Sequence, residues 1–314
     1  MRYEDFSCEK LTVGQIFNKS GNLIMPGPGC NPSGGLDYYV DGNKTVNGPD
    51  GLSWGRAFNT LATAIAASDV SIAATRNRWW ARRNRIFVVG DALSENLVKF
   101  PTKCDVIGLG SYDGFTQAGL SGRHVPVGES YGTRFFNIHF KAVAHASPIV
   151  TLTVTTGSAP SGVQFHGCTF DGTLGTMTSG ILSTAMPGLG VFDCDFVGTF
   201  VTSYISFGAG EAGRARIIGN RMLGTAGKGI IAASDMTTSW AAVVAKNIIN
   251  STGIWLDDDS DLLYVVDNRA FTAVNCATST AGYDFNIKRA CGNIQTEGNA
   301  GLCDTVPFTL IAEG

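Results

Sequence analysis

The chain has 314 residues, of which 40 are glycine and only 16% are charged, and its formal net charge is −3. This length suffices for one large elongated domain or for two compact ones. The small negative charge excludes a global attraction to nucleic acid, and no apolar run is long enough to span a membrane. The first ten residues, MRYEDFSCEK, have acidic side chains and no apolar run, which predicts a protein made in a cytoplasm without a signal peptide.

Residues 1–34 are predicted to be a non-repetitive N-terminal arm. Leu11 and Val13 begin an alternating pattern before a polar turn at residues 18–22, which indicates a small hairpin or an extended arm. The linker-like sequence PGPGCNPSGG follows. We expect this arm to dock onto a partner through Leu11, Val13 and Phe17, and the alternative is a frayed terminus.

Residues 35–85 are predicted to be a helical cap. After a short strand and a polar, Gly-rich loop, apolar residues recur at the spacing of an amphipathic helix. The residues predicted on one face of this helix are Phe58, Leu61, Ala62, Ile65 and Ile72. Such a helix can cover one end of the repeat array that begins next, where an apolar core and strand backbone would otherwise lie open.

The segment RNRWWARRNR, at residues 76–85, carries five arginines and two tryptophans. Arginine and aromatic side chains combine at surfaces for nucleic acids or acidic partners. Because no wider basic field surrounds the segment, a loop whose tryptophans pack on the cap is the simpler interpretation. Arginine and tryptophan are also favoured interface anchors, so we expect Arg78, Trp79, Trp80 and Arg82 to contact another subunit or partner protein.

Residues 86–300 contain a phrase that returns at a nearly constant interval. It reads VFDCDFVG at residues 191–198, RIIGNRMLG at residues 216–224 and VVDNRAF at residues 265–271. The central residues of successive phrases are Cys168, Cys194, Asn220, Asn247, Asn268 and Asn293, at steps of 26, 26, 27, 21 and 25 residues. Periods in the twenties predict a solenoid, in which one repeat cannot bury its apolar face alone.

Each phrase alternates apolar and polar residues with the period of a strand. The residues predicted to face inward are Phe192, Cys194, Phe196, Ile218, Asn220, Met222, Val266, Asn268 and Ala270. The residues predicted to face outward are Asp193, Asp195, Gly219, Arg221, Asp267 and Arg269. Strands one coil apart should lie parallel and in register, about 4.8 Å apart.

Stacking the coils predicts an inward ladder of asparagine side chains. Asn220, Asn247, Asn268 and Asn293 would each bond to the next, which satisfies their buried polar groups. Cys168 and Cys194 would extend this ladder as small, inert residues. The eight cysteines of the chain have no CxxC spacing, so we expect most of them to be free thiols and none to bind zinc.

In these phrases the chain resembles the right-handed parallel β-helix, the pectate-lyase-like fold, over roughly residues 36–299. The resemblance implies an all-β solenoid with an N-terminal arm and an amphipathic capping helix. Residues 301–314 leave the repeat, and we expect their apolar residues to cover the C-terminal end of the solenoid or to pair with other subunits. The phrase YVDG…DGLSW…AF.TL..AI also resembles the N-terminal cap of β-helix proteins of tailed bacteriophages, including tailspikes and other virion proteins. Such proteins usually form homotrimers, so the resemblance implies self-association.

Two outward carboxylates are the only catalytic candidates. Asp193 and Asp195 should emerge together on the outer face, where a β-helix hydrolase carries its acid and base. Arg221 should lie one coil from Asp195, however, and an exposed cross-strand ion pair is the simpler account. His166 is expected to be an inward core residue of the first regular coil.

An acidic run follows at Asp257, Asp259 and Asp261, which match the first ligands of a calcium loop. Position six of that loop is Leu262 where glycine is needed, and position twelve is Asn268, already assigned to the ladder. A solvated turn is the expected structure, and we expect no metal or other cofactor. The calcium-binding acidic cluster and catalytic base of pectate lyases have no convincing counterpart here, so that activity is not carried over.

Together these features favour a non-enzymatic structural protein in the virion of a tailed bacteriophage, assembled in the host cytoplasm. It would be a capsid decoration protein or a short spike, with capsid or tail proteins and further copies of itself as partners and no nucleic acid or membrane. The alternative is a tailspike that degrades or binds a host surface glycan, because catalytic residues of a β-helix can come from adjacent subunits and leave no linear motif.

Overall fold

The structure is a computed structural model. It describes residues 16–17, 23–25, 34–45, 47–74, 82–90, 93–110, 117–128, 130–143, 146–153, 160–184, 188–208, 214–232, 242–253, 255–258, 263–272, 287–291 and 294–295.

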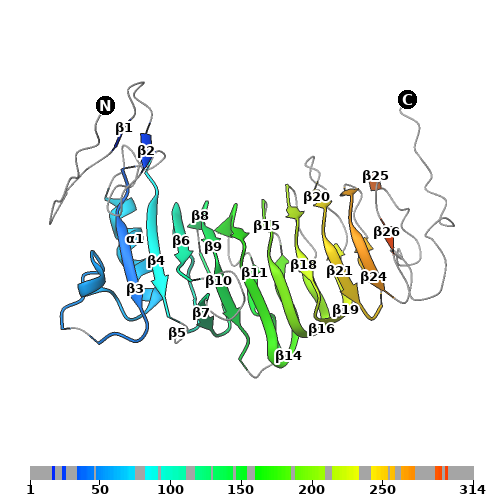
Figure 1. The fold of residues 1–314 in the computed structure, drawn as a ribbon, viewed down its shortest axis with the longest axis horizontal. Helices are drawn as coiled ribbons and strands as arrows, with labels where there is room; N and C mark the ends of the chain where they lie inside the picture. Colours follow the sequence, from blue (N-terminus) through cyan, green and yellow to red (C-terminus); the bar gives the residue numbers. More distant parts are fainter. Residues whose placement is uncertain are drawn as a thin grey trace, which may run out of the picture.

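The chain winds into a stack of coils, and successive coils contribute neighbouring strands to two parallel sheets (Figure 1). The ten-stranded sheet contains β3 (Asp37–Asp41), β4 (Asn84–Val89), β6 (Cys104–Gly108), β9 (Arg134–Phe136), β13 (Gln164–His166), β15 (Gly190–Phe192), β17 (Arg216–Ile218), β20 (Ala242–Ala245), β23 (Leu263–Val266) and β25 (Ile287–Cys291). The twelve-stranded sheet contains β5 (Leu93–Ser94), β7 (Ala118–Ser121), β10 (Ile138–Lys141), β11 (Val150–Thr153), β14 (Thr169–Thr184), β16 (Asp195–Phe207), β18 (Arg221–Met222), β19 (Thr225–Ala232), β21 (Ile248–Ser251), β22 (Leu256–Asp258), β24 (Arg269–Thr272) and β26 (Ile294–Gln295). A small parallel pair joins β8 (Ser130–Tyr131) to β12 (Pro160–Ser161). The all-β parallel β-helix predicted from the sequence is confirmed, whereas its right-handedness and its pectate-lyase-like character stay predictions.

A residue in the left-handed backbone region ends most of the short strands of the ten-stranded sheet. This column consists of Asn137, Gly167, Asp193, Gly219, Lys246 and Asp267, with φ between 51° and 75°. The left-handed conformation makes a sharp corner between the two sheets, so the period-two alternation stops there. The residue before each corner faces outward, and the residue after it faces inward.

This corner makes part of the predicted alternation wrong. Four residues that were predicted to face inward instead lie half-buried on the outer face, namely His166, Phe192, Ile218 and Val266. Their preceding neighbours fill the core instead, and these are Phe165, Val191, Ile217 and Val265. Beyond the corner the prediction holds, because Cys194, Phe196, Asn220, Met222, Asn268 and Ala270 are all buried.

The inward ladder is present from Cys168 to Asn268. Each backbone N–H donates to the side chain one coil further on: Cys168 to Cys194 Sγ at 3.4 Å, Cys194 to Asn220 Oδ1 at 2.9 Å, Asn220 to Asn247 Oδ1 at 3.0 Å and Asn247 to Asn268 Oδ1 at 3.0 Å. Each asparagine Nδ2 also donates to a carbonyl of the preceding coil, from Asn220 to Val191, from Asn247 to Ile217 and from Asn268 to Val244. The corner interrupts strand pairing, and these amides satisfy the backbone groups that it leaves inside. Asn293 lies outside the described residues.

Aromatic side chains stack along the core in the same direction. Phe140, Phe170 and Phe196 are fully buried, with ring centroids 5.2 and 4.8 Å apart from one coil to the next. Burial also raises the pKa of the Cys194 thiol, so this ladder member stays protonated and inert, as predicted. Cys104, Cys168 and Cys194, the cysteines whose side chains are described, are free.

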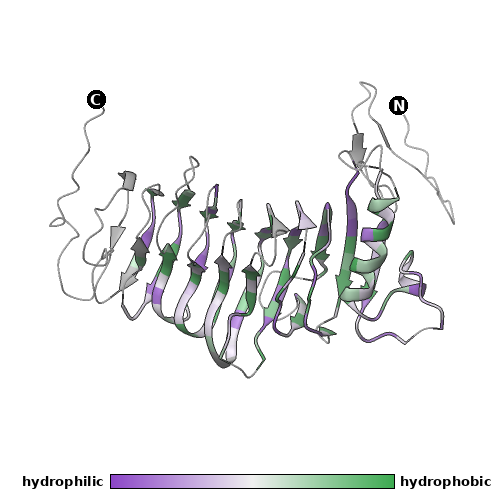
Figure 2. Ribbon diagram, turned by 180° about the vertical axis from the view of Figure 1, so that it is seen from behind, coloured by the Kyte–Doolittle hydropathy of each residue, from purple (hydrophilic) through white to green (hydrophobic). Residues whose placement is uncertain are grey.

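Helix α1 (Leu61–Ala73) covers the N-terminal end of the stack, after a single 3-10 turn at Trp54–Arg56 (Figure 2). Its buried face consists of Leu61, Ala64, Ile65, Ser68 and Ile72. Ala62, predicted on that face, is exposed because it lies in the first turn on the side away from the stack. Phe58, predicted on the same helical face, is buried as expected but lies before the helix, which begins only at Leu61.

Two polar side chains fix this cap to the first coils. Buried Asn84 in β4 donates to the hydroxyls of Ser68 and Ser71, and its Oδ1 accepts from the Leu36 N–H at 2.8 Å. Glu95 accepts from the first N–H groups of α1, Leu61 at 2.6 Å and Ala62 at 2.9 Å. A carboxylate at this position also interacts favourably with the helix dipole.

The N-terminal hairpin is confirmed by the antiparallel pairing of β1 (Ile16–Phe17) with β2 (Leu23–Met25). Leu11 and Val13 lie outside the described residues, as does the side chain of Phe17. The roles of residues 1–34 as a docking arm and of residues 301–314 as an end cover stay predictions.

Candidate functional site

The outer face of the ten-stranded sheet carries two parallel columns of side chains. The first, the charged column, runs in register through Asp37, Arg85, Asp105, Arg134, Gln164, Gly190 and Arg216. The second, the apolar stripe, runs through Tyr39, Phe87, Ile107, Phe136, His166, Phe192, Ile218, Ala245 and Val266. Each of the seven strands from β3 to β17 thus contributes one residue to each column, and β20 and β23 extend the apolar stripe alone.

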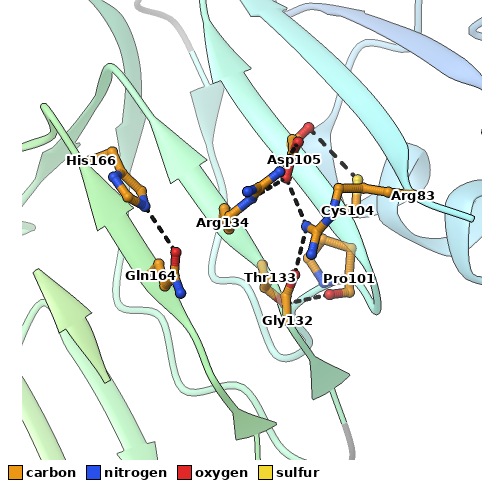
Figure 3. Close-up of polar contacts among 9 residues, drawn as sticks. All are labelled: Arg83, Pro101, Cys104, Asp105, Gly132, Thr133, Arg134, Gln164 and His166. Atoms are coloured by element: carbon orange, nitrogen blue, oxygen red, sulfur yellow. Dashed lines mark hydrogen bonds and ion pairs between the residues drawn. The ribbon is translucent and has the colours of Figure 1, made fainter. Parts of the chain in front are cut away.

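Oppositely charged residues alternate along the first four members of the charged column. Arg134 holds both oxygens of Asp105, with Nε–Oδ1 at 2.7 Å and Nη2–Oδ2 at 2.6 Å (Figure 3). Arg83 reaches the same carboxylate at 2.7 Å and also donates to the carbonyl of Gly132. Arg85 forms an equivalent two-pronged pair with Asp37. Half-buried ion pairs with two hydrogen bonds hold both side chains in place. They are therefore better suited to stabilising the sheet surface than to binding a ligand.

Hydrogen bonding to Asp105 raises the pKa of Arg134, so this guanidinium is permanently charged. The same side chain lies over the Phe136 ring at 5.6 Å, and Arg85 lies over Phe87 at 5.4 Å. These cation–π contacts join the charged column to the apolar stripe, so the two columns form one continuous surface.

Three rings of the apolar stripe stack almost parallel to one another. The His166 ring lies between Phe136 and Phe192, with centroid distances of 4.8 and 4.7 Å and interplanar angles of 16° and 18°. Its Nε2 is 3.0 Å from Gln164 Oε1 (Figure 3). Burial and the nearby Arg134 guanidinium lower the pKa of His166, which favours the neutral ring that stacks best.

The outer face of the twelve-stranded sheet carries a different polar group. His139 Nε2 and Asp171 Oδ2 are 3.1 Å apart across neighbouring coils. Burial raises the pKa of Asp171, but hydrogen bonds from His139 and Thr173 outweigh it and bring the pKa to about 2. Gln117 covers the next position, accepting from Thr169 Oγ1 at 2.7 Å and donating to Asn137 Oδ1 at 2.8 Å. Both His139 and Thr169 are buried beneath this layer.

Both catalytic candidates, Asp193 and Asp195, lie in surroundings that have a structural role. Asp195 is directly opposite Arg221 in the parallel register, with Oδ1–Nε at 3.6 Å, as the sequence predicted. Asp193 is the left-handed corner residue, and its Oδ1 lies against Gly219 in the next coil. The two carboxylates therefore belong to different local structures, a strand and a corner.

The remaining predicted sites are only partly described. Of the predicted partner contacts near the cap, Arg82 donates to the carbonyl of Gly34 at 2.7 Å, while Arg78, Trp79 and Trp80 lie outside the described residues. Asp257 is in β22, whereas Asp259 and Asp261 lie outside the described residues. Within the described part of the chain, no three His, Cys, Asp or Glu residues form a metal-ligand group, and no helix is long and apolar enough to cross a membrane.

Sequence reasoning missed the apolar stripe. Its signal is a doublet of large or apolar residues before the corner residue, as in Phe135-Phe136-Asn137, Val191-Phe192-Asp193, Ile217-Ile218-Gly219 and Val265-Val266-Asp267. Strict alternation would place the second member of each doublet inside. A corner residue prone to the left-handed region, such as Asn, Asp or Gly, indicates instead that it faces outward.

No protein-family model matches this chain, and no curated protein matches it. Among solved structures, the chain is similar to the tailspike protein of Acinetobacter phage vB_ApiP_P1, with 13% sequence identity and a TM-score of 0.34. The match covers 74% of this chain and 56% of that one, so the chain spans little more than half the length of that tailspike. The fold assignment rests on the coils and sheets themselves.

Proposed function

We propose that this chain is a non-enzymatic structural protein of a tailed-phage virion, in which the solenoid forms a rigid shaft. The observation that carries the proposal is the continuous stacking of coils. Short strands pair in parallel from β3 to β25, and the inward ladder links five successive coils through side-chain hydrogen bonds. A rod in which each coil satisfies the backbone groups of the next resists bending and local opening.

The assignment to a virion is supported by the resemblance of the cap segment to phage β-helix proteins. In this proposal residues 1–34 attach the shaft to capsid or tail proteins, and the protein is a capsid decoration protein or a short spike. Copies associate as a homotrimer, and assembly takes place in the host cytoplasm. The Asp195–Arg221 pair and the corner position of Asp193 support a structural role for these carboxylates.

Quantitative mass spectrometry of purified virions tests this proposal. The chain should be present at a fixed copy number per particle, and removal of residues 1–34 should abolish its incorporation while the solenoid still folds. A chain absent from purified virions would overturn the virion assignment, and virions that retain the truncated protein would overturn the docking role.

A second assay separates the structural protein from the alternative, a tailspike that degrades or binds a host glycan. The purified protein is incubated with host surface polysaccharide, and reducing ends are measured together with bound polysaccharide. A structural protein releases no reducing ends and retains no polysaccharide. Cleavage that is lost in Asp195→Asn would instead establish the enzyme.

A further inference from the structure

The apolar stripe is unusual for a sheet face that contacts only water. Outward positions of such a face are normally polar, yet every position from Tyr39 to Val266 in this column is apolar or aromatic except His166. The equivalent outward column of the twelve-stranded sheet is mostly polar, and contains His139, Thr169, Asp195, Arg221 and Arg269. The exposed Trp54 extends this surface at one end, because its ring lies 4.8 Å from that of Tyr39. Contiguous apolar surface of this kind marks an interaction site.

The ring geometry indicates which partner the stripe can accept. A saccharide stacks on the face of an aromatic ring. In the stripe, the faces of His166 are occupied by Phe136 and Phe192, while Tyr39 and Phe87 stack on each other at 5.7 Å. These rings therefore offer edges and neighbouring aliphatic groups to the outside. Such a surface packs against other apolar side chains, as protein interfaces do.

The length and period of the stripe favour a second copy of this chain. Nine successive strands contribute to it, and at about 4.8 Å per strand it extends for about 38 Å. A partner must be straight over that length and must present side chains at the same spacing. The same face of another copy meets both conditions at every coil, because its strands repeat with the identical period.

The first four members of the charged column do not oppose such an arrangement. Copies lying side by side in the same direction bring like residues to similar heights. Asp37 is neutralised by Arg85 within its own chain, and Asp105 is neutralised by Arg134 and Arg83. The exposed fractions of the two carboxylate side chains are only 5% and 13%, so neither presents an unpaired negative charge to the neighbour. The exposed Arg216, two residues before Ile218, would bring like charges of two copies near each other and must therefore lie at the edge of the contact.

From these relationships we infer that copies of the chain associate side by side through the apolar stripe on the outer face of the ten-stranded sheet. This inference rests on the self-association included in the proposed function and assigns a surface to it. Ile218 lies near the centre of the C-terminal half of this stripe, and it is half-buried in the single chain.

Sedimentation velocity of the full chain over a range of concentrations tests the inference with a matched pair of variants. Ile218→Arg places a charge in the stripe. Ile231→Arg makes the same change at a half-buried outward position of β19, on the twelve-stranded sheet. The unmodified chain and Ile231→Arg should sediment as the same oligomer, and Ile218→Arg should sediment as a monomer with an unchanged far-UV circular dichroism spectrum.

A chain that is monomeric at every concentration would overturn the inference, as would an Ile218→Arg variant that keeps the oligomer or an Ile231→Arg variant that loses it. If Ile218→Arg fails to fold, Phe136→Arg in an earlier coil replaces it, with the same expected mass. These results are independent of the virion assignment. A monomer found in purified virions contradicts this inference and the homotrimer of the proposed function but leaves the virion assignment standing. An oligomer that is lost in Ile218→Arg but is absent from virions contradicts only the virion assignment.

Discussion

Asn247 Oδ1 accepts two hydrogen bonds from Asn220, one from the backbone N–H at 3.0 Å and one from Nδ2 at 2.9 Å. Asn247 repeats the same relationship with Asn268 in the next coil. Asn220 and Asn247 thus each serve as acceptor for the coil before them and as donor to the coil after them. All three side chains are buried, so none of these bonds is exchanged for a bond to water without opening the solenoid.

Replacing the central amide should therefore be costly. Asn247→Ala removes the acceptor of two Asn220 donors and leaves a cavity, and we expect it to lower the free energy of unfolding by about 3 kcal/mol. In a chain of this size that loss corresponds to a thermal midpoint several degrees lower. Asn250→Ala is the control, because Asn250 is exposed and makes a single side-chain bond, to Gly224. Equal midpoints for the two variants would contradict the ladder as a source of stability.

The left-handed corner predicts that Gly219 tolerates alanine poorly, whereas Lys246, at the equivalent position of the next coil, tolerates glycine. Gly219 has φ +75°, and a Cβ there would lie 2.3 Å from Asp193 Oδ1, so Gly219→Ala should destabilise the protein by about 1–2 kcal/mol. Lys246 occupies the same corner one coil later with φ +57°. Lys246→Gly should change stability by less than about 1 kcal/mol, because glycine relieves backbone strain but gains freedom in the unfolded chain. Thermal unfolding of both variants measures the contrast, and a harmless Gly219→Ala would contradict the corner geometry.

Acid should destabilise the fold in two separate steps. Burial lowers the pKa of His124 from 6.5 to about 3, since its imidazole has no access to water. Between pH 6.5 and pH 3 the imidazole is protonated in the unfolded chain but neutral in the folded one. The contribution of His124 to the free energy of unfolding is therefore complete above pH 6.5 and declines as the pH falls toward 3. Asp171, with its pKa lowered from 3.8 to about 2, adds a further loss only below pH 3.8.

Thermal midpoints measured between pH 7 and pH 2 test this order. In the unmodified chain the Leu97 N–H donates to His124 Nδ1 at 3.3 Å. His124→Asn keeps an acceptor for this N–H and removes the titrating ring. The midpoint of this variant should vary less between pH 6.5 and pH 4 than that of the unmodified chain. An unchanged pH profile would show that His124 is not buried as a neutral ring.

The carboxylate cap of helix α1 should be worth more than a surface ion pair. Glu95→Gln replaces one acceptor oxygen with an amide nitrogen at the Leu61 and Ala62 N–H groups, and we expect a loss of about 1 kcal/mol. Asp50→Asn is the comparison, because it breaks the exposed pair with Arg56 and should have no measurable effect. Hydrogen exchange of the α1 amides provides a local measurement, in which Glu95→Gln should speed exchange throughout the helix. Unchanged exchange would show that Glu95 does not hold the cap.

The sequence was sufficient for the architecture because the ladder residues are spaced by the circumference of one coil. Cys194, Asn220 and Asn268 could be aligned from their intervals alone, and the pairing of Asp195 with Arg221 followed from that alignment. The amphipathic pattern also located helix α1, although Ala62 was assigned to the wrong side.

The outer surface could not be obtained in the same way. The orientation of Phe192 depends on the backbone conformation of Asp193, and aspartate adopts both extended and left-handed conformations. The single-residue corner reverses the inward and outward assignment of the strand before it. Contacts between neighbouring coils or between a coil and the cap, such as Arg83 and Arg134 on Asp105 or Glu95 on α1, join positions 22 to 34 residues apart in the sequence and have no local signature.

Cryo-electron microscopy of purified particles, with and without the gene for this chain, tests the central claim most directly. The account predicts slender projections on the head or the tail that are absent from the deletion particles, and averaged density of each shaft should show rungs about 4.8 Å apart. Particles that are identical with and without the gene would contradict it.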